Sequence, residues 1–256
     1  MNLSEKFSQL HAGSHPFILG NIWDVASAHA FAGSGYKAIG TSSQAVAIAN
    51  GYKDGEELPF SILLQLAKKV VEQTDIPFTV DLEGGYARSI AGITDNISKL
   101  HDAGVVGINL EDTIASGGRK FLAVDEFAKI LAAVADHISQ HNLGIFLNVR
   151  TDGFLLGLPN ALEETLKRIK PYQDAGANGL FTPCITAAAD IRAVVNATSL
   201  PVNVMCMPGL PGFDELAALG VKRISMGGFL FNKIYKTVQD LGQAVAREKN
   251  FSSILF

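Results

Sequence analysis

The sequence predicts a (β/α)₈ barrel, and three observations favour this fold class. The chain has 256 residues, and one barrel of this kind typically has about 250. Eight short apolar runs, rich in Val, Ile and Phe, alternate with helix-like segments, and each follows a Pro or a Gly. Charged residues make up only 18% of the chain, which suits parallel strands that are buried on both faces. We therefore expect one α/β domain that spans residues 1–256.

The expected strands follow one another along the chain and are separated by segments with helical periodicity. They cover residues 17–19, 36–41, 78–81, 105–111, 145–150, 177–182, 202–205 and 221–226. In one helical segment, Leu162, Leu166 and Ile169 recur at the spacing of a helix face. Asn160 precedes this segment, with Glu163 three residues later, so Asn160 is expected to be its N-cap residue.

Glycines mark the junctions at which a helix ends and the next strand begins. Residues 102–107 resemble residues 174–179, and Gly104 and Gly176 occupy the same place in this weak internal repeat. Gly35 and Gly220 stand at equivalent junctions, and each of the four is expected to be the left-handed residue after a helix. A closed barrel is favoured because no Gly-x-Gly-x-x-Gly follows the first strand. An open doubly wound sheet is the alternative.

Composition argues against several classes of partner and location. The net charge of −4 provides no basic surface for nucleic acid. Residues 1–6 lack the basic and apolar regions of a signal peptide, and no run of about 18 apolar residues could span a membrane. Cys184 and Cys206 are too few for a disulfide framework, so both are expected to be buried structural thiols in a cytoplasmic protein.

Three carboxylates follow neighbouring strands, at the end of a parallel barrel where active sites lie. Asp81 and Glu83 are two residues apart, which would place them on one face of an extended strand, and Glu111 ends the next strand. Oxygen ligands of this kind suit Mg²⁺ or Mn²⁺. Any one of these acids could instead cap a helix or pair with a basic residue, but the three together favour a metal site.

Other polar strand ends offer groups that could bind an acid. Arg150 could bind a carboxylate or phosphonate through two hydrogen bonds, or could form a structural bridge to Glu111. Ser42 and Ser43 could donate hydrogen bonds to an anion, or could simply begin the next segment as turn residues. The six histidines fall on expected helices or on the N-terminal arm, so a histidine-based metal site or triad is not expected.

The motifs from about residue 20 to about residue 231, taken in order, resemble those of the isocitrate lyase and phosphoenolpyruvate mutase superfamily. The matching segments are residues 21–28, 35–43, 51–55, 80–86, 108–112 and 148–152. In this superfamily the segment like residues 80–86 carries magnesium-binding aspartates, and the segment like residues 148–152 carries a substrate-binding arginine. Their shared order makes the resemblance specific, although each motif alone is modest.

The resemblance implies a barrel whose last helix is exchanged between the subunits of a homotetramer. It also implies Mg²⁺, a small anionic 2-oxo or 2-hydroxy acid as substrate, and cleavage or formation of a C–C or P–C bond through a pyruvate enolate on the metal. The implied site residues are Asp81, Glu83 and Glu111 for the metal, directly or through water, Ser42, Ser43 and Arg150 for the acid, and Asp54 with Arg150 for catalysis.

The chain departs from this pattern in the loop after Glu111. The isocitrate and methylisocitrate lyases carry a Lys-x-Cys-Gly-His motif there, whereas residues 113–121 contain neither Cys nor His. Arg119 and Lys120 are expected to close over the substrate from this loop. Glu83 stands where the relatives have aspartate. A tricarboxylate lyase is therefore disfavoured, and the metal remains expected.

Three hypotheses follow for the function. The first is a Mg²⁺-dependent lyase, decarboxylase or mutase for a 2-oxo acid of the oxaloacetate or phosphonopyruvate type. The second is a non-catalytic relative that binds a carboxylate ligand, and the third is an unrelated metal-dependent aldolase barrel. The apolar C-terminal segment 251–256 is expected to pack on the barrel or on a neighbouring subunit.

Overall fold

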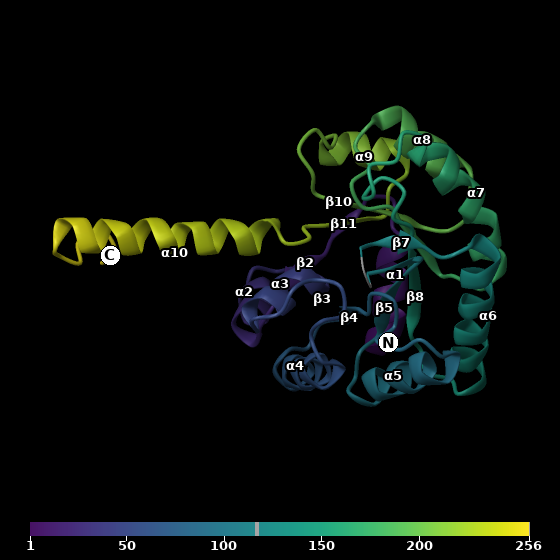
Figure 1. Ribbon diagram of the computed structural model, residues 1–256, viewed down its shortest axis with the longest axis horizontal. Coiled ribbons are helices and arrows are strands. Elements are labelled where there is room, and N and C mark those ends of the chain that lie inside the picture. Colours follow the sequence, from purple (N-terminus) through teal and green to yellow (C-terminus); the bar gives the residue numbers. More distant parts are fainter. Residues whose placement is uncertain (116–117, 256) are drawn as a thin grey trace.

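A single parallel sheet forms the centre of the molecule, in a computed structural model that describes residues 1–115 and 118–255. Its strands run in the order β1-β11-β10-β9-β8-β5-β4-β3-β2 (Figure 1). The strand bounds are β1 Phe17–Ile18, β2 Gly20–Ile22, β3 Ile39–Thr41, β4 Phe78–Asp81, β5 Gly107–Glu111, β8 Phe146–Arg150, β9 Gly179–Phe181, β10 Val202–Met205 and β11 Arg223–Ser225.

The two outer strands of this order, β1 and β2, are separated by Leu19 alone, and together they close the barrel. The Leu19 amide donates to the carbonyl of Ile224 at 2.9 Å, and the next amide, of Gly20, donates to the carbonyl of Ala38 at 3.2 Å. This stretch therefore pairs with β11 on one side and with β3 on the other. The predicted barrel is confirmed, with its first strand divided into two short pieces.

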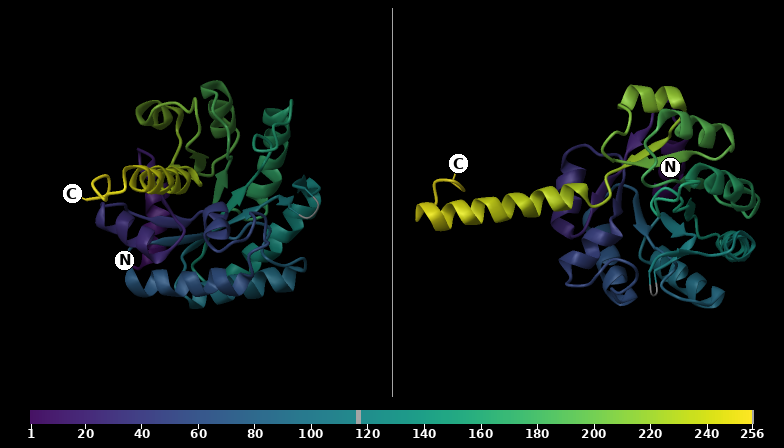
Figure 2. Two further views of the ribbon diagram at one scale, coloured as in Figure 1. Left: turned by 60° about the vertical axis from the view of Figure 1, so that its left-hand side comes forward. Right: turned by 45° about the horizontal axis from the view of Figure 1, so that its top comes forward.

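Helices alternate with the strands and surround the barrel (Figure 2). They are α2 Val25–Gly33, α3 Ser43–Ala49, α4 Phe60–Gln73, α5 Ile90–Asp102, α6 Val124–Gln140, α7 Ala161–Asp174, α8 Ala188–Asn196 and α9 Phe213–Leu219. Gly35, Gly104, Gly176 and Gly220 have φ values of 81°, 90°, 97° and 93°, as expected for residues that end helices. Asn160 is the N-cap residue of α7, as predicted, although its side chain forms no capping bond.

Helix α1, Leu3–His11, closes the amino-terminal end of the barrel with aromatic side chains. The His11 ring stacks on Phe146 with 4.1 Å between centroids, and Phe7 meets Phe146 edge to face at 5.6 Å. A Cβ atom on Gly107 would lie 2.7 Å from the Phe7 ring, so a glycine at that position lets the ring enter the barrel. The site must therefore lie at the opposite end.

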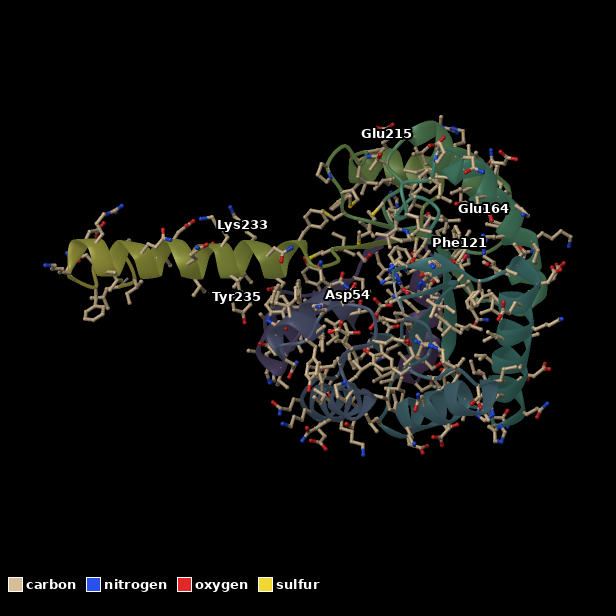
Figure 3. The ribbon with its side chains drawn as sticks, in the orientation of Figure 1. Asp54, Phe121, Glu164, Glu215, Lys233 and Tyr235 are labelled. Carbon is tan, nitrogen blue, oxygen red and sulfur yellow. The ribbon has the colours of Figure 1, made fainter. Side chains whose placement is uncertain are left out.

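A small hairpin, β6 Thr113–Ile114 with β7 Lys120–Phe121, follows β5. Residues 116 and 117 of the expected loop lie outside the described residues. The Arg168 guanidinium lies 3.7 Å from the centre of the Phe121 ring, and Figure 3 shows Phe121 near α7. Arg168 also donates to the carbonyl of Leu122 at 3.2 Å and pairs with Asp112 at 3.3 Å. The base of the hairpin is thus fixed to α7.

The last helix, α10 Phe229–Glu248, extends away from the barrel (Figure 1). Its apolar side chains Tyr235 and Val238 are 48% and 57% exposed, and Leu255 in the following tail is 73% exposed. The C-terminal segment therefore does not pack on its own barrel, and packing on another subunit stays a prediction. None of the described helices is both long and apolar enough to cross a lipid bilayer.

Candidate active site

A cavity of about 520 Å³ opens at the carboxyl end of the strands. Among the predicted residues, Ser42, Ser43, Asp54, Asp81 and Arg150 line it, whereas Glu83 and Glu111 are buried beside it. Figure 3 shows Asp54 on the side of the barrel that faces α10. A larger cavity of about 810 Å³ lies beside α1 at the other end. It contains none of the residues at the carboxyl ends of the strands, so the smaller cavity is the candidate active site.

Arg150 ends β8 and pairs with carboxylates from the neighbouring strand and from its own loop. Its Nη1 lies 2.9 Å from Oε2 of Glu111 and 3.8 Å from Oδ2 of Asp81, and its Nε lies 2.6 Å from Oδ1 of Asp152. Burial alone lowers the pKa of Arg150, but the negative charges of these three carboxylates raise it well above its usual value. Arg150 therefore stays a cation, and it is both the predicted bridge to Glu111 and part of the cavity wall.

Arg119 reaches from the hairpin into the same cluster of charges. Its guanidinium pairs with Glu111, lies 3.1 Å from Oδ2 of Asp152, and lies 3.6 Å from Oδ2 of Asp54. Thr113 supports this arrangement because its hydroxyl donates to Oδ2 of Asp152 at 2.7 Å. The neighbouring Lys120 is exposed on β7. Of the two basic residues expected to cover the site, Arg119 alone lines the cavity.

Glu83 is adjacent to the site but does not face the cavity. Strand β4 ends at Asp81, and Glu83 has a φ of 49°, so the two acids do not share a face of an extended strand. Its oxygens accept hydrogen bonds from the Glu56 amide at 3.1 Å and from the Tyr86 hydroxyl at 2.9 Å. Burial, followed by the negative charge of Asp81, raises the pKa of Glu83 to about 9.

The acidic side chains at the cavity determine how a divalent cation could be held there. Within the described ranges 1–115 and 118–255, no three His, Cys, Asp or Glu side chains form a group that could hold a metal ion directly. Asp81 lines the cavity, with Asp54 as a second carboxylate of the wall. Burial, followed by the negative charge of Asp81, raises the pKa of Asp54, and a cation between these acids would relieve that repulsion. This set fits Mg²⁺, which commonly keeps several waters and uses one or two carboxylates.

Ser42 begins the next segment as a turn residue, and both Ser42 and Ser43 lie at the cavity, where a hydrogen bond to an anion stays a prediction. The Ser42 side chain caps α3 by accepting from the Ala45 amide at 3.4 Å, and its own amide donates to the carbonyl of Ile22 at 3.0 Å. Both serines also line the cavity, and a hydrogen bond from Ser43 lowers the pKa of Asp54. The turn therefore positions two hydroxyl groups at the mouth of the site.

Several residues of the site were not singled out by the sequence analysis. Asp152 binds both arginines, and Asn109 and Arg223 form part of the cavity wall. A possible signal was the alternation along the last strand, which places Arg223 on the same face as Ser225. The two cysteines differ from expectation, because Cys206 is exposed and Cys184 is only partly buried. Burial raises the pKa of the Cys184 thiol, as expected for an unactivated cysteine.

The comparisons with known proteins agree with this arrangement. The family model for phosphoenolpyruvate phosphomutase matches residues 7–246. The chain is 34% identical over 221 residues to an uncharacterized protein of Mycobacterium tuberculosis, with 86% of this chain and 81% of that protein covered. It is 27% identical over 237 residues to an oxaloacetate decarboxylase of Paraburkholderia xenovorans, with 89% and 77% covered.

Solved structures show the same fold. The chain has 38% identity and a TM-score of 0.89 with a putative phosphonomutase from Burkholderia cenocepacia, with 94% of this chain and 99% of that chain covered. A 2,3-dimethylmalate lyase shares the fold at 17% identity, with a TM-score of 0.87 and with 98% and 90% covered. The barrel with its acidic and basic cluster thus places the protein in the phosphoenolpyruvate mutase and isocitrate lyase superfamily.

The chain belongs to the phosphoenolpyruvate phosphomutase family. The relatives named in this family are of the lyase or mutase type, which favours the first of the three hypotheses, and an unrelated aldolase barrel is excluded as the origin of the chain.

Proposed function

We propose that this enzyme makes or breaks a C–C or P–C bond in a small 2-oxo or 2-hydroxy acid of the oxaloacetate or phosphonopyruvate type, through a pyruvate enolate. The observation that supports this most directly is the pair of Arg150 and Asp81, whose charged groups lie 3.8 Å apart in one cavity wall. A bound divalent cation near Asp81 would supply positive charge for the developing enolate oxygen.

The residues of the chain would divide the other tasks between them. Arg150 would orient the substrate carboxylate, with Ser42 and Ser43 as hydrogen-bond donors at the mouth of the cavity. Arg119 would cover the substrate and exclude water through its bonds to Glu111 and Asp152. Asp54 would act as the catalytic acid or base, because its carboxyl lines the same cavity.

The hairpin favours a reaction that needs no acid from this loop. Burial alone lowers the pKa of Arg119, but the negative charge of Glu111 raises it above its ordinary value, so this guanidinium cannot donate a proton at neutral pH. The lyases that carry a loop cysteine have such a donor. Decarboxylation, in which water can later protonate the enolate, is therefore preferred over cleavage of a tricarboxylate.

A second candidate is a carboxylate-binding relative without catalytic activity. It is favoured by the occupied oxygens of Glu83, which accept hydrogen bonds from Tyr86 and Glu56, and by the direct pairing of Glu111 with Arg150. Such a protein would bind a 2-oxo acid and release it unchanged.

Product analysis separates these two candidates. The protein is incubated with Mg²⁺ and with oxaloacetate or phosphonopyruvate, and pyruvate and phosphoenolpyruvate are followed by NMR. Oxaloacetate with Mg²⁺ but without protein is the control for spontaneous decarboxylation. We expect turnover that stops in EDTA and falls by about 10²-fold or more in D81N, the order of magnitude expected when one group that stabilises transition-state charge is lost. D95N, an exposed substitution on α5, is the matched control.

The outcomes are distinct. Full activity in EDTA would contradict the proposal that the reaction depends on a metal ion. Thermal stabilisation by the acids without any product would favour the carboxylate-binding relative.

The expected assembly through α10 is also a proposal, supported by the exposed apolar side chains of that helix.

A further inference from the structure

Arg223, the first residue of β11, is a buried cation at the cavity wall. Its side chain is 1% exposed, yet it lines the same cavity as Asp81 and Arg150. Its Nη2 donates to Oδ1 of Asn109 at 3.0 Å, whereas Nε and Nη1 have no acceptor among the residues that the structure describes. Two nitrogen atoms of a buried guanidinium beside the cavity are therefore without an acceptor.

The surroundings of Arg223 contain amides and an aromatic ring, and no carboxylate of the described part of the chain forms an ion pair with it. Asn148 also donates to Oδ1 of Asn109, at 2.8 Å. The Phe181 ring centre lies 5.9 Å from the guanidinium carbon, a distance at which a cation–π attraction operates. Neutral groups thus hold Arg223 in place without cancelling its charge.

This arrangement is costly unless an anion joins it. Burial lowers the pKa of Arg223 to about 10, partly offset by the negative charge of Asp81, so the side chain is still charged at neutral pH. A buried charge without a partner is strongly unfavourable. Water could satisfy the two free donors, but it would not balance the charge.

We propose that Arg223 is a second anion-binding group of the active site, which receives the distal carboxylate or phosphonate of the substrate. This inference rests on the proposed function, in which Arg150 and the two serines bind the 2-oxo acid end. The substrate would then carry an anionic group at each end. A simple monoacid would leave Arg223 without its partner.

The volume of the cavity agrees with an extended substrate. The cavity that these groups line has a volume of about 520 Å³, and apolar side chains of Leu155, Phe181 and Met205 form part of its wall. A diacid could therefore span from Arg150 to Arg223 with its carbon chain against these residues. Arg223 would select such diacids, because monoacids of equal length offer it no oxygen acceptor.

Succinate is the first probe, since it has two carboxylates but no 2-oxo group and cannot react. Its dissociation constant is measured by calorimetry in EDTA at fixed ionic strength, for the wild type, R223M and K222M. Lys222 is the matched control because it loses the same charge one residue away, where its ammonium donates to the carbonyl of Gly13. We expect K222M to bind like the wild type and R223M to bind at least about ten-fold more weakly, which is the loss expected for hydrogen bonds to a charged group.

Equal affinity of R223M and the wild type would overturn the proposal, as would the absence of succinate binding to the wild type. R223Q replaces R223M if the latter does not fold. In a second arm, the inhibition of oxaloacetate turnover by succinate and by the monoacid 2-oxobutyrate is compared, and R223M should weaken inhibition by succinate and leave inhibition by 2-oxobutyrate unchanged. If no 2-oxo acid is turned over while succinate binding still depends on Arg223, the proposed function fails and the anion site stands.

Discussion

Acidification should destabilise the barrel through His11, the histidine that closes its amino-terminal end. The side chain is 4% exposed, and its Nδ1 is bonded to the carbonyl of Phe7 at 2.9 Å. Burial, followed by the positive charge of Arg223, lowers the pKa of His11 from 6.5 to about 3. Folding therefore keeps this imidazole neutral at a pH at which the unfolded chain would protonate it.

The sign and size of the effect follow from this difference. Above pH 6.5 the His11 ring is neutral in both states and adds no pH dependence. Below that pH, His11 binds a proton in the unfolded state, whereas in the folded state it stays neutral until about pH 3. The free energy of unfolding therefore decreases as the pH falls. Two pH units below 6.5, the loss is about 2.7 kcal/mol, at about 1.36 kcal/mol per unit.

Urea unfolding of the wild type and of H11F, each at pH 7.5 and pH 4.5, measures the contribution of His11 to the pH dependence of stability. Phenylalanine keeps a ring against Phe146 but cannot titrate, so the drop in free energy of unfolding should be about 2.7 kcal/mol smaller in H11F. H15F changes an exposed histidine of the same segment and should behave as the wild type. An equal drop in H11F and the wild type would refute the assignment of this pH dependence to His11.

Two further predictions concern the hairpin anchor and the last helix. D112A removes the carboxylate that binds Arg168 and Tyr172, and should lower the free energy of unfolding by about 3–5 kcal/mol in urea, because it leaves a buried charge less well paired. D95A, on an exposed pair with Lys99, should cost less than about 1 kcal/mol. V238E combined with L241E should convert an oligomer to a monomer in light scattering, whereas K233E on the same helix should not. Unchanged masses would exclude α10 as the interface.

The barrel was predictable because the residues that end its helices and begin its strands can be recognised from the local sequence. Gly104 and Gly176 each adopt the left-handed conformation that ends a helix. A glycine followed by an apolar run therefore indicates, from the local sequence alone, where a helix ends and the next strand begins. The division of the first strand at Leu19 was not predictable. It arises because the Leu19 amide bonds to Ile224 on one side and the Gly20 amide bonds to Ala38 on the other, and these partners are distant in the sequence. The direction of α10 depends on packing that no local pattern of the sequence encodes.

The site was predictable where a residue ends a strand, and less so elsewhere. Asp81 and Arg150 end β4 and β8, so their place in the cavity follows from the architecture. Glu83 lies beyond the end of its strand, where the turn toward Gly85 decides its direction. Arg223 begins its strand and lies inside the barrel. Whether its guanidinium has a charged partner there depends on side chains from β5 and β9, which are distant in sequence.

Arg223 also couples the active site electrostatically to His11 at the amino-terminal end of the barrel. The same unneutralised charge that would attract a distal anion contributes to the lowered pKa of His11 on the α1 side. An anion bound to Arg223 would cancel part of that repulsion, so the pKa of His11 should rise toward its ordinary value when succinate binds. By linkage, the succinate dianion should then bind more tightly to the protein with His11 protonated than to the protein with His11 neutral. The coupling should disappear in R223M, because both effects depend on this one charge.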